Sequence, residues 1–379
     1  MENNISLLVG LLNNLEYNKH FYATTRALYP DIELCFVSYG SIDGTHEWLD
    51  SLVDDNVKYY YSEERKTFSD TFNKATELAS NEYVAYLHND IVLAPGFIEN
   101  LQPHLNLNTV VSYTTIEPPI FAGHERPGKI IHDLGTSLDS FDIDELYEYV
   151  ADQQIKYQNK IEPGITFFMC LSREKLLSIG GMDNLFNPMF CEDDDLIQRL
   201  NLIGMNCITA LDVICYHFVS KTSRFSLDYQ EKTNQIEHNS NRNFIRKWGF
   251  RKSIHNKTYD IGFSIKNCNL ELLELLEPWC SNILIDDEMQ VLTTHYIDKE
   301  QKNTSFDLTK RILTTPFQTL DNEIIVEMDR LSFTQQEWLY LNQLSDMIHE
   351  TNEIGIFQLG GLKISINQMN EYQNDLIKL

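Results

Sequence analysis

Basic side chains are scarce in this sequence. Its 379 residues include 56 aspartates and glutamates but only 30 lysines and arginines, which gives a formal net charge of −26. Nucleic acids and anionic membrane surfaces are bound through clustered positive charge, so this balance argues against both as partners. It remains compatible with a local site for an anionic ligand that brings its own divalent cation.

Long apolar runs and paired cysteines are also lacking. No run approaches the roughly 20 apolar residues of a transmembrane helix. The N-terminal stretch MENNISLLVGLLNN lacks the basic segment and long apolar core of a signal peptide. The seven cysteines form no CxxC pair and lie mostly in apolar runs, as reduced core thiols do. We therefore expect a cytoplasmic protein without a membrane-spanning segment.

The first part of the chain alternates between two hydrophobic patterns. Strands are expected at Ile5–Leu12, Ile32–Val37, Val57–Tyr61 and Tyr83–Leu87, and helices at Leu15–Leu28, His46–Leu52 and Phe68–Ala79. Strands and helices in such short succession predict βαβ units, and hence an α/β domain with a mostly parallel sheet and helices on both faces. The length of the chain favours a second domain after it.

Three polar residues follow the apolar strand at Tyr83–Leu87. His88, Asn89 and Asp90 would lie at its carboxyl end, which is where open α/β sheets place ligands. The carboxylate of Asp90 is a suitable ligand for Mg²⁺ or Mn²⁺, with phosphate oxygens completing the coordination. Taken alone, the group is more simply interpreted as polar turn residues at the end of a strand.

The order of these elements resembles the nucleotide-binding half of GT-A glycosyltransferases, in particular family 2. The family's Gly-Ser-x-Asp-Gly-Thr turn is intact at Gly40–Thr45, whereas the two aspartates that usually precede it are Ser38 and Tyr39 here. The family's DxD metal motif aligns with His88–Asp90, of which only the last carboxylate is retained. By this resemblance, the residues around the donor nucleotide and its metal are Ser38, Asp43, Asn73, His88, Asn89 and Asp90.

A run of four acidic residues, Glu192–Asp195, precedes apolar residues at helical spacing. Acidic groups in a first helical turn are stabilised by about 0.3–1 kcal/mol each, and Asp195 can pair with Arg199 one turn later. Four carboxylates exceed what capping needs. Their mutual repulsion is expected to raise the pKa of one of them, which is the property required of a general base. The segment also matches the Glu-Asp-x-Asp-Leu signature of family 2. The resemblance implies that Asp193 deprotonates the acceptor hydroxyl, with Glu192 beside it.

A histidine ends the apolar run DVICYH at His217. Family 2 often has a histidine at this place, and it can join the DxD carboxylate on the metal, so the resemblance makes His217 a candidate ligand. A lone histidine at a strand end is more often structural than a metal ligand. The resemblance further implies that the loop Ser220–Arg224 closes over the diphosphate, with Lys221 and Arg224 near the phosphates.

The resemblance ends near residue 251, so we expect a catalytic domain at residues 1–252 and a small α+β accessory domain at residues 253–379. Expected strands in the second domain are Tyr259–Ile265, Asn282–Ile285, Gln290–Thr294, Ile324–Glu327 and Ile354–Leu359; expected helices are Leu270–Leu276, Gln335–Ile348 and Ile366–Leu379. We find no catalytic constellation in it. The two roles considered for it are positioning of an acceptor and self-association into a homo-oligomer.

The sequence thus predicts a metal-dependent, inverting glycosyltransferase that uses Mn²⁺ or Mg²⁺. It would move a sugar from a nucleotide-diphosphate sugar to a hydroxyl of a glycan or glycoconjugate. A sugar nucleotidyltransferase is a second hypothesis, but its usual basic, Gly-rich loop is missing from LVGLLNNLEYN. A catalytically silent nucleotide-sugar-binding or scaffold protein is a third, favoured by Ser38, Tyr39 and His88 and opposed by the intact acidic run. The sequence names neither the sugar, the base nor the acceptor.

Overall fold

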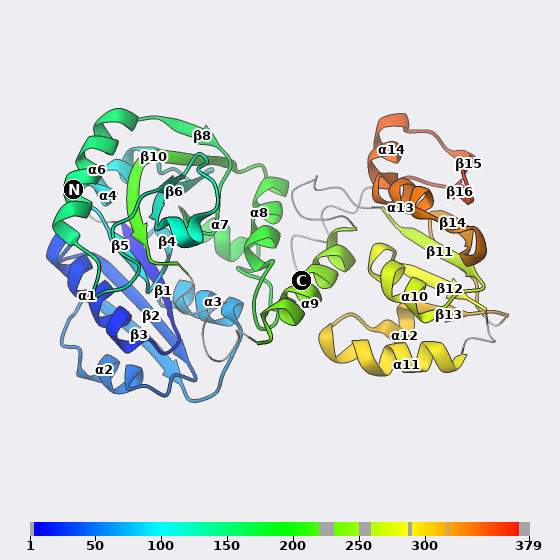
Figure 1. Cartoon of the computed structure of the whole chain (residues 1–379), viewed down its shortest axis with the longest axis horizontal. Helices are drawn as coiled ribbons and strands as arrows, with labels where there is room; N and C mark the ends of the chain where they lie inside the picture. Colours follow the sequence, from blue (N-terminus) through cyan, green and yellow to red (C-terminus); the bar gives the residue numbers. More distant parts are fainter. Residues whose placement is uncertain (1–3, 220–230, 250–258, 287–289, 317, 371–379) are drawn as a thin grey trace. The chain divides into compact units, whose positions relative to one another are not determined.

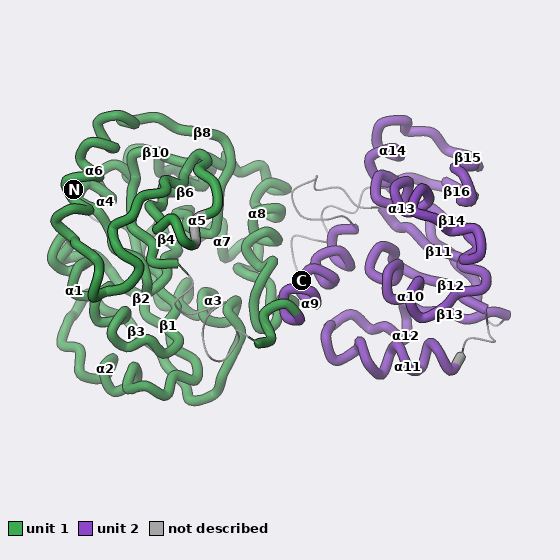
Figure 2. The backbone as a smooth tube through the Cα atoms, in the orientation of Figure 1, with its two compact units in different colours: residues 1–234 green, residues 235–379 purple. Residues whose placement is uncertain are grey.

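The chain divides into two compact units, Met1–Asn234 and Gln235–Leu379 (Figure 2). The structure is a computed structural model that describes residues 4–219, 231–249, 259–286, 290–316 and 318–370. The division falls within the first turn of helix α9 (Thr233–Trp248), whereas the boundary predicted at residue 252 lies after that helix. Each unit has its own sheet and its own apolar core, and the two are described separately.

The N-terminal unit is built on one sheet with the strand order β3-β2-β1-β4-β9-β6-β10-β5, with β7 beside β6 and β8 beside β10 (Figure 1). The strands are β1 (Ile5–Leu11), β2 (Glu33–Tyr39), β3 (Val57–Ser62), β4 (Tyr83–His88), β5 (Ile91–Leu93), β6 (Thr109–Glu117), β7 (Lys129–Ile131), β8 (Ile161–Pro163), β9 (Met169–Ser172) and β10 (Asn206–His217). The run β3-β2-β1-β4 is parallel, as is the pair β6-β10. This confirms the predicted α/β class with a mostly parallel sheet.

The helices of this unit follow the strands in the predicted alternation. They are α1 (Leu15–Leu28), α2 (Thr45–Ser51), α3 (Phe68–Leu78), α4 (Phe97–Leu101), α5 (Pro119–Ala122), α6 (Ile143–Tyr157), α7 (Arg173–Ser178) and α8 (Glu192–Leu202), with a 3₁₀ turn η1 (Gln102–His104). Among the described residues of the whole chain, no helix has the length and apolar character needed to cross a membrane.

Burial on both faces explains why the central strands are almost continuously apolar. Leu7 and Val9 of β1 belong to one core cluster together with Phe21 of α1, and Leu8 between them is also fully buried on the opposite face. A parallel strand covered by helices on both sides has no solvent-facing positions, so it shows no alternation of polar and apolar residues. The abrupt change to polar residues after β4 therefore marks the edge of the sheet.

The C-terminal unit contains a second sheet, ordered β13-β12-β11-β14-β16-β15. Its strands are β11 (Ile261–Lys266), β12 (Asn282–Ile285), β13 (Ile312–Thr314), β14 (Ile324–Asp329), β15 (Gly355–Leu359) and β16 (Leu362–Ile366). Besides α9, its helices are α10 (Leu270–Leu276), α11 (Gln290–Glu300), α12 (Leu308–Arg311), α13 (Gln335–Asn342) and α14 (Leu344–Thr351), with 3₁₀ turns η2 (Glu277–Trp279), η4 (Gln301–Asn303) and η5 (Arg330–Ser332). The first four strands in this order are parallel, and β16 and β15 are antiparallel.

Two element predictions for this unit were wrong. The segment Gln290–Thr294 begins helix α11 rather than forming a strand, because Thr293, Tyr296 and Glu300 are buried at helical spacing and outweigh the local β-branched composition. Ile366 ends strand β16 instead of starting a helix. The rest of that predicted helix lies partly beyond the described residues.

Candidate active site

The candidate site lies where the parallel strands β1, β2 and β4 end at the same edge of the sheet. The loop after β1 contains Asn13 and Asn14, both with a left-handed backbone (φ 53° and 60°), a conformation that asparagine tolerates better than most residues. The side chain of Asn13 accepts a hydrogen bond from the backbone N–H of Ile42 at 2.8 Å, which joins this loop to the loop after β2.

Asp43 ties the same two loops together. One carboxylate oxygen accepts a hydrogen bond from the backbone N–H of Leu15 at 2.8 Å, at the start of α1, and the other accepts one from the hydroxyl of Thr45 at 2.6 Å. Asp43 was predicted to lie beside the nucleotide. It is exposed at the expected edge, and its hydrogen bonds define the shape of the Gly40–Thr45 turn.

Ser38 occupies the place where the family usually has an aspartate, and its side chain is fully buried. Its Oγ lies 2.8 Å from the Oγ of Ser41 and 3.0 Å from Nε2 of His46. The His46 ring stacks on Tyr61, with centroids 4.4 Å apart, and its Nδ1 lies 3.1 Å from Glu63. The hydroxyl of Ser38 is thus part of an internal network below the turn.

The two predicted asparagines also make internal contacts. Asn73 bonds both ways to the backbone of Met182: its amide donates to the carbonyl at 2.8 Å, and its oxygen accepts from the N–H at 2.8 Å. Asn89 is buried and donates to the side chain of Asn18 at 2.6 Å. These bonds fix helix α3 to the turn at Gly181–Met182 and strand β4 to helix α1.

His88, Asp90 and His217 form a cluster that can hold a metal ion. Each offers one ligand atom, and these atoms lie within 4.8 Å of one another. Nε2 of His217 lies 3.5 Å from Oδ1 of Asp90, and Nδ1 of His88 lies 3.9 Å from the same oxygen. The antiparallel pairing of β5 with β10, in which His217 faces Ile91, brings the third residue beside the first two. Two imidazoles and one carboxylate fit a divalent transition metal.

Burial lowers the pKa of both histidines, whereas neighbouring carboxylates raise it. Burial lowers the pKa of His88 to about 4, an effect that Asp90 only partly offsets, so this imidazole is neutral and available as a ligand at pH 7. Burial also lowers the pKa of His217, but Asp90 and Glu117 outweigh it and raise the pKa to about 9. Since a metal ion binds only the neutral imidazole, binding would release the proton of His217.

Glu117 was not predicted from the sequence. It ends strand β6, which runs parallel to β10, and its Oε1 lies 3.3 Å from Nδ1 of His217. Its other oxygen pairs with Lys129 at 2.7 Å. A carboxylate on the outer nitrogen of a metal-binding histidine fixes its tautomer and raises its basicity. Only the register between β6 and β10 reveals this role, because 100 residues separate the two side chains.

A small cavity of about 80 Å³ adjoins His88. The residues that line it come from four separate segments: Gly10–Leu12, Tyr39, Lys66–Phe72 and Pro188–Met189 contribute to it together with His88. The ammonium group of Lys66 lies 5.4 Å from the centre of the Tyr39 ring. Lys66 therefore places a positive charge at the cavity, although the protein as a whole is strongly acidic.

The acidic run forms the first turn of helix α8, which begins shortly after the lining residues Pro188 and Met189. The backbone carbonyl of Pro188 accepts a hydrogen bond from the N–H of Phe68 at 2.9 Å, which fixes the segment before the helix. Glu192 is 6% exposed and Asp193 is half-buried in the first turn. The predicted pair of Asp195 with Arg199 is present at 2.7 Å. The predicted phosphate loop with Lys221 and Arg224 lies outside the described residues.

Open α/β sheets bind their ligands at the carboxyl ends of the strands, and the His88–Asp90–His217 cluster and the cavity both lie there. Residues 7–178 match the model of glycosyl transferase family 2. This match confirms the predicted resemblance and the predicted class of enzyme. No curated protein matches the chain.

Two solved structures show a weak likeness. One is a mannosyltransferase, PcManGT from Pyrobaculum calidifontis, in complex with GDP-Man and Mn²⁺, with 18% identity, 58% of each chain covered and a TM-score of 0.41. The other is GalNAc-T7 with UDP, GalNAc and Mn²⁺, with 12% identity, 57% of this chain and 44% of that chain covered, and a TM-score of 0.43. The chain thus spans roughly half the length of these two proteins.

Proposed function

We propose that the N-terminal unit transfers a glycosyl group from a nucleoside-diphosphate sugar to an acceptor hydroxyl, with inversion at the anomeric carbon. The observation that carries the proposal is the meeting of His88, Asp90 and His217 at the sheet edge, in a unit whose residues 7–178 match family 2. The donor would lie across the ends of β1, β2 and β4, beside the cavity lined by Tyr39 and Lys66. The acceptor would be a glycan or glycoconjugate.

His88, Asp90 and His217 would hold the metal. Mn²⁺ suits this set better than Mg²⁺, because Mg²⁺ prefers oxygen ligands and two of the three groups are imidazoles. When bound, the ion would stabilise the negative charge of the departing diphosphate. Lys66, which lines the cavity beside His88, would contribute positive charge to the same balance.

Asp193 would act as the general base. Its carboxylate would take the proton from the acceptor hydroxyl as that oxygen attacks the anomeric carbon, opposite to the departing diphosphate, and the single displacement inverts the configuration. The buried neighbour Glu192 would position this first turn of α8. Ser38 and Asn73, which make internal bonds, would support the nucleotide site by fixing its loops.

Donor binding is the first test. We expect one nucleoside-diphosphate sugar out of UDP-, GDP- and dTDP-sugars to raise the melting temperature of the full chain with Mn²⁺ and not with EDTA. A ligand at 100 times its Kd stabilises a protein by about 2.7 kcal/mol. Asp90→Asn should abolish the shift, whereas Asp144→Asn, an exposed carboxylate in the first turn of α6, should leave it unchanged.

The base is tested with Asp193→Asn in the same preparations. This variant should bind the donor as the wild type does but transfer or hydrolyse the sugar about 10²–10⁴ times more slowly. Wild-type turnover by this variant would remove Asp193 from the mechanism. Binding of no donor by the wild type at millimolar concentration would contradict the whole proposal, and donor binding without any turnover would favour a silent nucleotide-sugar-binding protein.

A further inference from the structure

The C-terminal unit contains a cavity of about 840 Å³ that the proposed reaction does not use. Its lining residues come mainly from α9, α10 and α11, and α13 contributes Trp338. Every residue that lines it belongs to this unit. Its volume is that of a ligand pocket, for which roughly 300–1,000 Å³ is usual.

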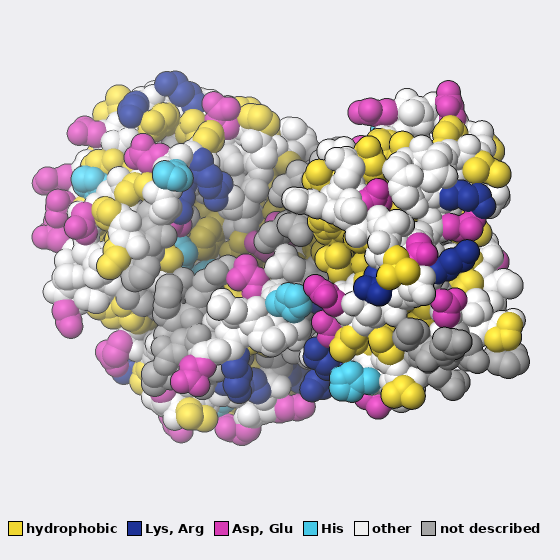
Figure 3. Space-filling view, turned by 45° about the vertical axis from the view of Figure 1, so that its right-hand side comes forward, with side chains coloured by type: hydrophobic (Ala, Val, Ile, Leu, Met, Phe, Trp, Pro, Cys, Tyr) yellow, Lys and Arg dark blue, Asp and Glu magenta, His cyan; other side chains and the backbone are white. Residues whose placement is uncertain are grey.

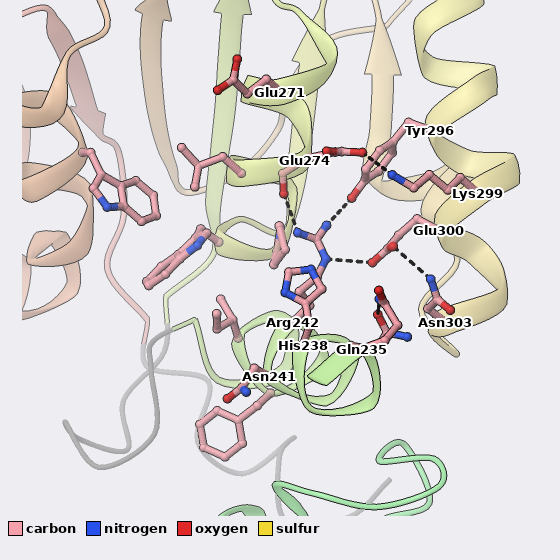
Figure 4. A pocket seen from close by; sticks show the side chains of 17 residues that line it. Gln235, His238, Asn241, Arg242, Glu271, Glu274, Tyr296, Lys299, Glu300 and Asn303 are labelled. Atoms are coloured by element: carbon pink, nitrogen blue, oxygen red, sulfur yellow. Dashed lines mark hydrogen bonds and ion pairs between the residues drawn. The ribbon is translucent and has the colours of Figure 1, made fainter. Parts of the chain in front are cut away.

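Most charged side chains of the cavity form ion pairs, and carboxylates outnumber lysines and arginines. Arg242 reaches from α9 towards α11, where its Nε donates to Oε1 of Glu300 at 2.8 Å and its Nη2 to the hydroxyl of Tyr296 (Figure 4). Lys299 pairs with Glu274 at 2.8 Å. A third carboxylate, Glu271, also lines the cavity. Three carboxylates against two permanent cations disfavour a phosphate, a nucleotide or any other anionic ligand.

Two indole rings line the same cavity. Trp279 and Trp338 form an edge-to-face pair with centroids 5.3 Å apart and planes at 86°, and both are only half-buried. Leu275, which also lines the cavity, is 40% exposed. Large apolar rings left accessible in a concave site are typical of a binding surface, and they offer flat apolar area with one polar N–H.

The remaining lining groups suit hydroxyl ligands. Gln235, Asn239, Asn241 and Asn303 line the cavity, and their amides each combine donors with an acceptor. A hydroxyl group also donates and accepts hydrogen bonds. Amides and paired carboxylates can therefore bind several hydroxyls of an uncharged ligand. This polar lining disfavours a lipid chain, which has no groups that could hydrogen-bond to it.

We propose that this cavity binds a neutral saccharide. A sugar ring has an apolar face of C–H groups and a rim of hydroxyls, which match the indoles and the amide-rich wall respectively. The binding site is separate from the donor site and is argued from the lining of the C-terminal unit alone. That the saccharide is part of the acceptor glycan rests on the function proposed above.

Buried ion pairs hold the walls of the cavity in place. Arg246 of α9 pairs with Glu277 at 2.7 Å and with Glu300 at 2.6 Å, and both of its partners are nearly inaccessible to solvent. The hydroxyl of Tyr296 donates to Glu277 at 2.9 Å. The network therefore fixes α9 against η2 and α11, so the cavity is formed before any ligand binds.

The test uses the full chain on an array of defined neutral and acidic oligosaccharides, followed by titration of the bound glycans with tryptophan fluorescence as the readout. We expect neutral glycans to bind and to change the fluorescence. Trp338→Ala should weaken binding about tenfold or more. His238→Ala, an exposed lining residue of α9, should weaken it by a smaller factor. His295→Ala, an exposed histidine of α11 that does not line the cavity, is the matched control and should bind as the wild type does.

The variant Asp90→Asn distinguishes a failure of this proposal from a failure of the proposed glycosyl transfer. It should abolish the metal-dependent donor shift and leave glycan binding unchanged. Loss of glycan binding in Asp90→Asn, with normal binding in Trp338→Ala, would place the glycan in the N-terminal unit and overturn the proposal. Binding of no neutral glycan, or of acidic glycans only, would overturn it as well. If Trp338→Ala fails to fold, His238→Ala and Gln235→Ala, both at exposed positions of α9, decide the outcome.

Discussion

At the scale of single residues, the proposed metal site depends on a side chain that does not touch the metal position. Glu117 contacts the outer nitrogen of His217, so the inner nitrogen, Nε2, faces Asp90. Burial raises the pKa of Glu117, but His217 and Lys129 outweigh it and lower the pKa, so the carboxylate is ionised at neutral pH. An ionised partner makes the imidazole a stronger ligand.

Replacing this carboxylate should weaken metal binding. We expect Glu117→Gln to lower the affinity of the full chain for Mn²⁺ by about 10- to 100-fold, as is usual for such outer partners of metal ligands. Isothermal titration with MnCl₂ in the absence of nucleotide measures the effect. Glu148→Gln, an exposed glutamate of α6, is the matched control and should bind Mn²⁺ as the wild type does. Equal affinities in the two variants would refute the role of Glu117.

At the scale of elements, buried ion pairs join helix α9 to η2 and α11 within the C-terminal unit. Glu277 is fully buried and accepts hydrogen bonds from Arg246 and Arg311. Burial raises the pKa of Glu277, but the charge of Arg246 and its other partners outweighs this effect and lowers the pKa to about 2. Removing one charged side chain of such a network leaves its partners as buried charges without an opposite charge beside them.

We therefore expect Glu277→Ala to destabilise the C-terminal unit by about 3–5 kcal/mol at pH 7, as measured by urea unfolding. Asp298→Ala, at an exposed position of α11, should change stability by less than about 0.5 kcal/mol. A similar small change for Glu277→Ala would show that the network contributes little.

The same network gives a pH dependence with a defined sign. The pKa of Glu277 is lower in the folded protein than in the unfolded chain, so its contribution is complete above about pH 4.5 and is lost as the pH falls towards 2. The difference in stability between the wild type and Glu277→Ala should therefore be constant from pH 7 to 5 and shrink below pH 4.5. A difference that grows on acidification would contradict this assignment.

At the scale of the whole molecule, two separate apolar cores support two sheets. Leu7 and Phe21 belong to the core of the N-terminal unit, and Leu273 and Ile283 to that of the C-terminal unit. Units that each bury their own core can unfold separately. The face shown in Figure 3 carries acidic side chains with smaller groups of lysine and arginine, as the net charge of −26 leads one to expect.

A core substitution in one unit should leave the function of the other intact. Leu273→Ala, at a fully buried position of α10, should lower the stability of the C-terminal unit by about 2–5 kcal/mol. Leu275→Ala on the same helix, where the side chain is 40% exposed, should cost much less. Calorimetry of the full chain should show one transition shifted, with the metal-dependent donor shift preserved. Loss of donor binding in Leu273→Ala would show that the two units depend on each other.

The sequence by itself determined the architecture of the N-terminal unit. Alternating apolar and amphipathic segments are local patterns, and α1 runs from Leu15 to Leu28 as predicted because Pro30 limits its continuation. The intact Gly40–Thr45 turn lies within residues 7–178, where the family match confirms the predicted resemblance, whereas the acidic run at Glu192–Asp195 lies beyond the matched residues. These features depend on residues that are close together in the chain.

Only the tertiary structure decided which distant side chains meet. The pairing of β10 with β5 and β6 brings His217 to Asp90 and Glu117, and strand register is a long-range property that no local pattern encodes. The ion pairs around Glu277 likewise join residues from different elements. The cavity in the C-terminal unit has no local signature at all, because its lining comes from helices separated by up to about a hundred residues. Packing free energy, rather than local propensity, selects such contacts.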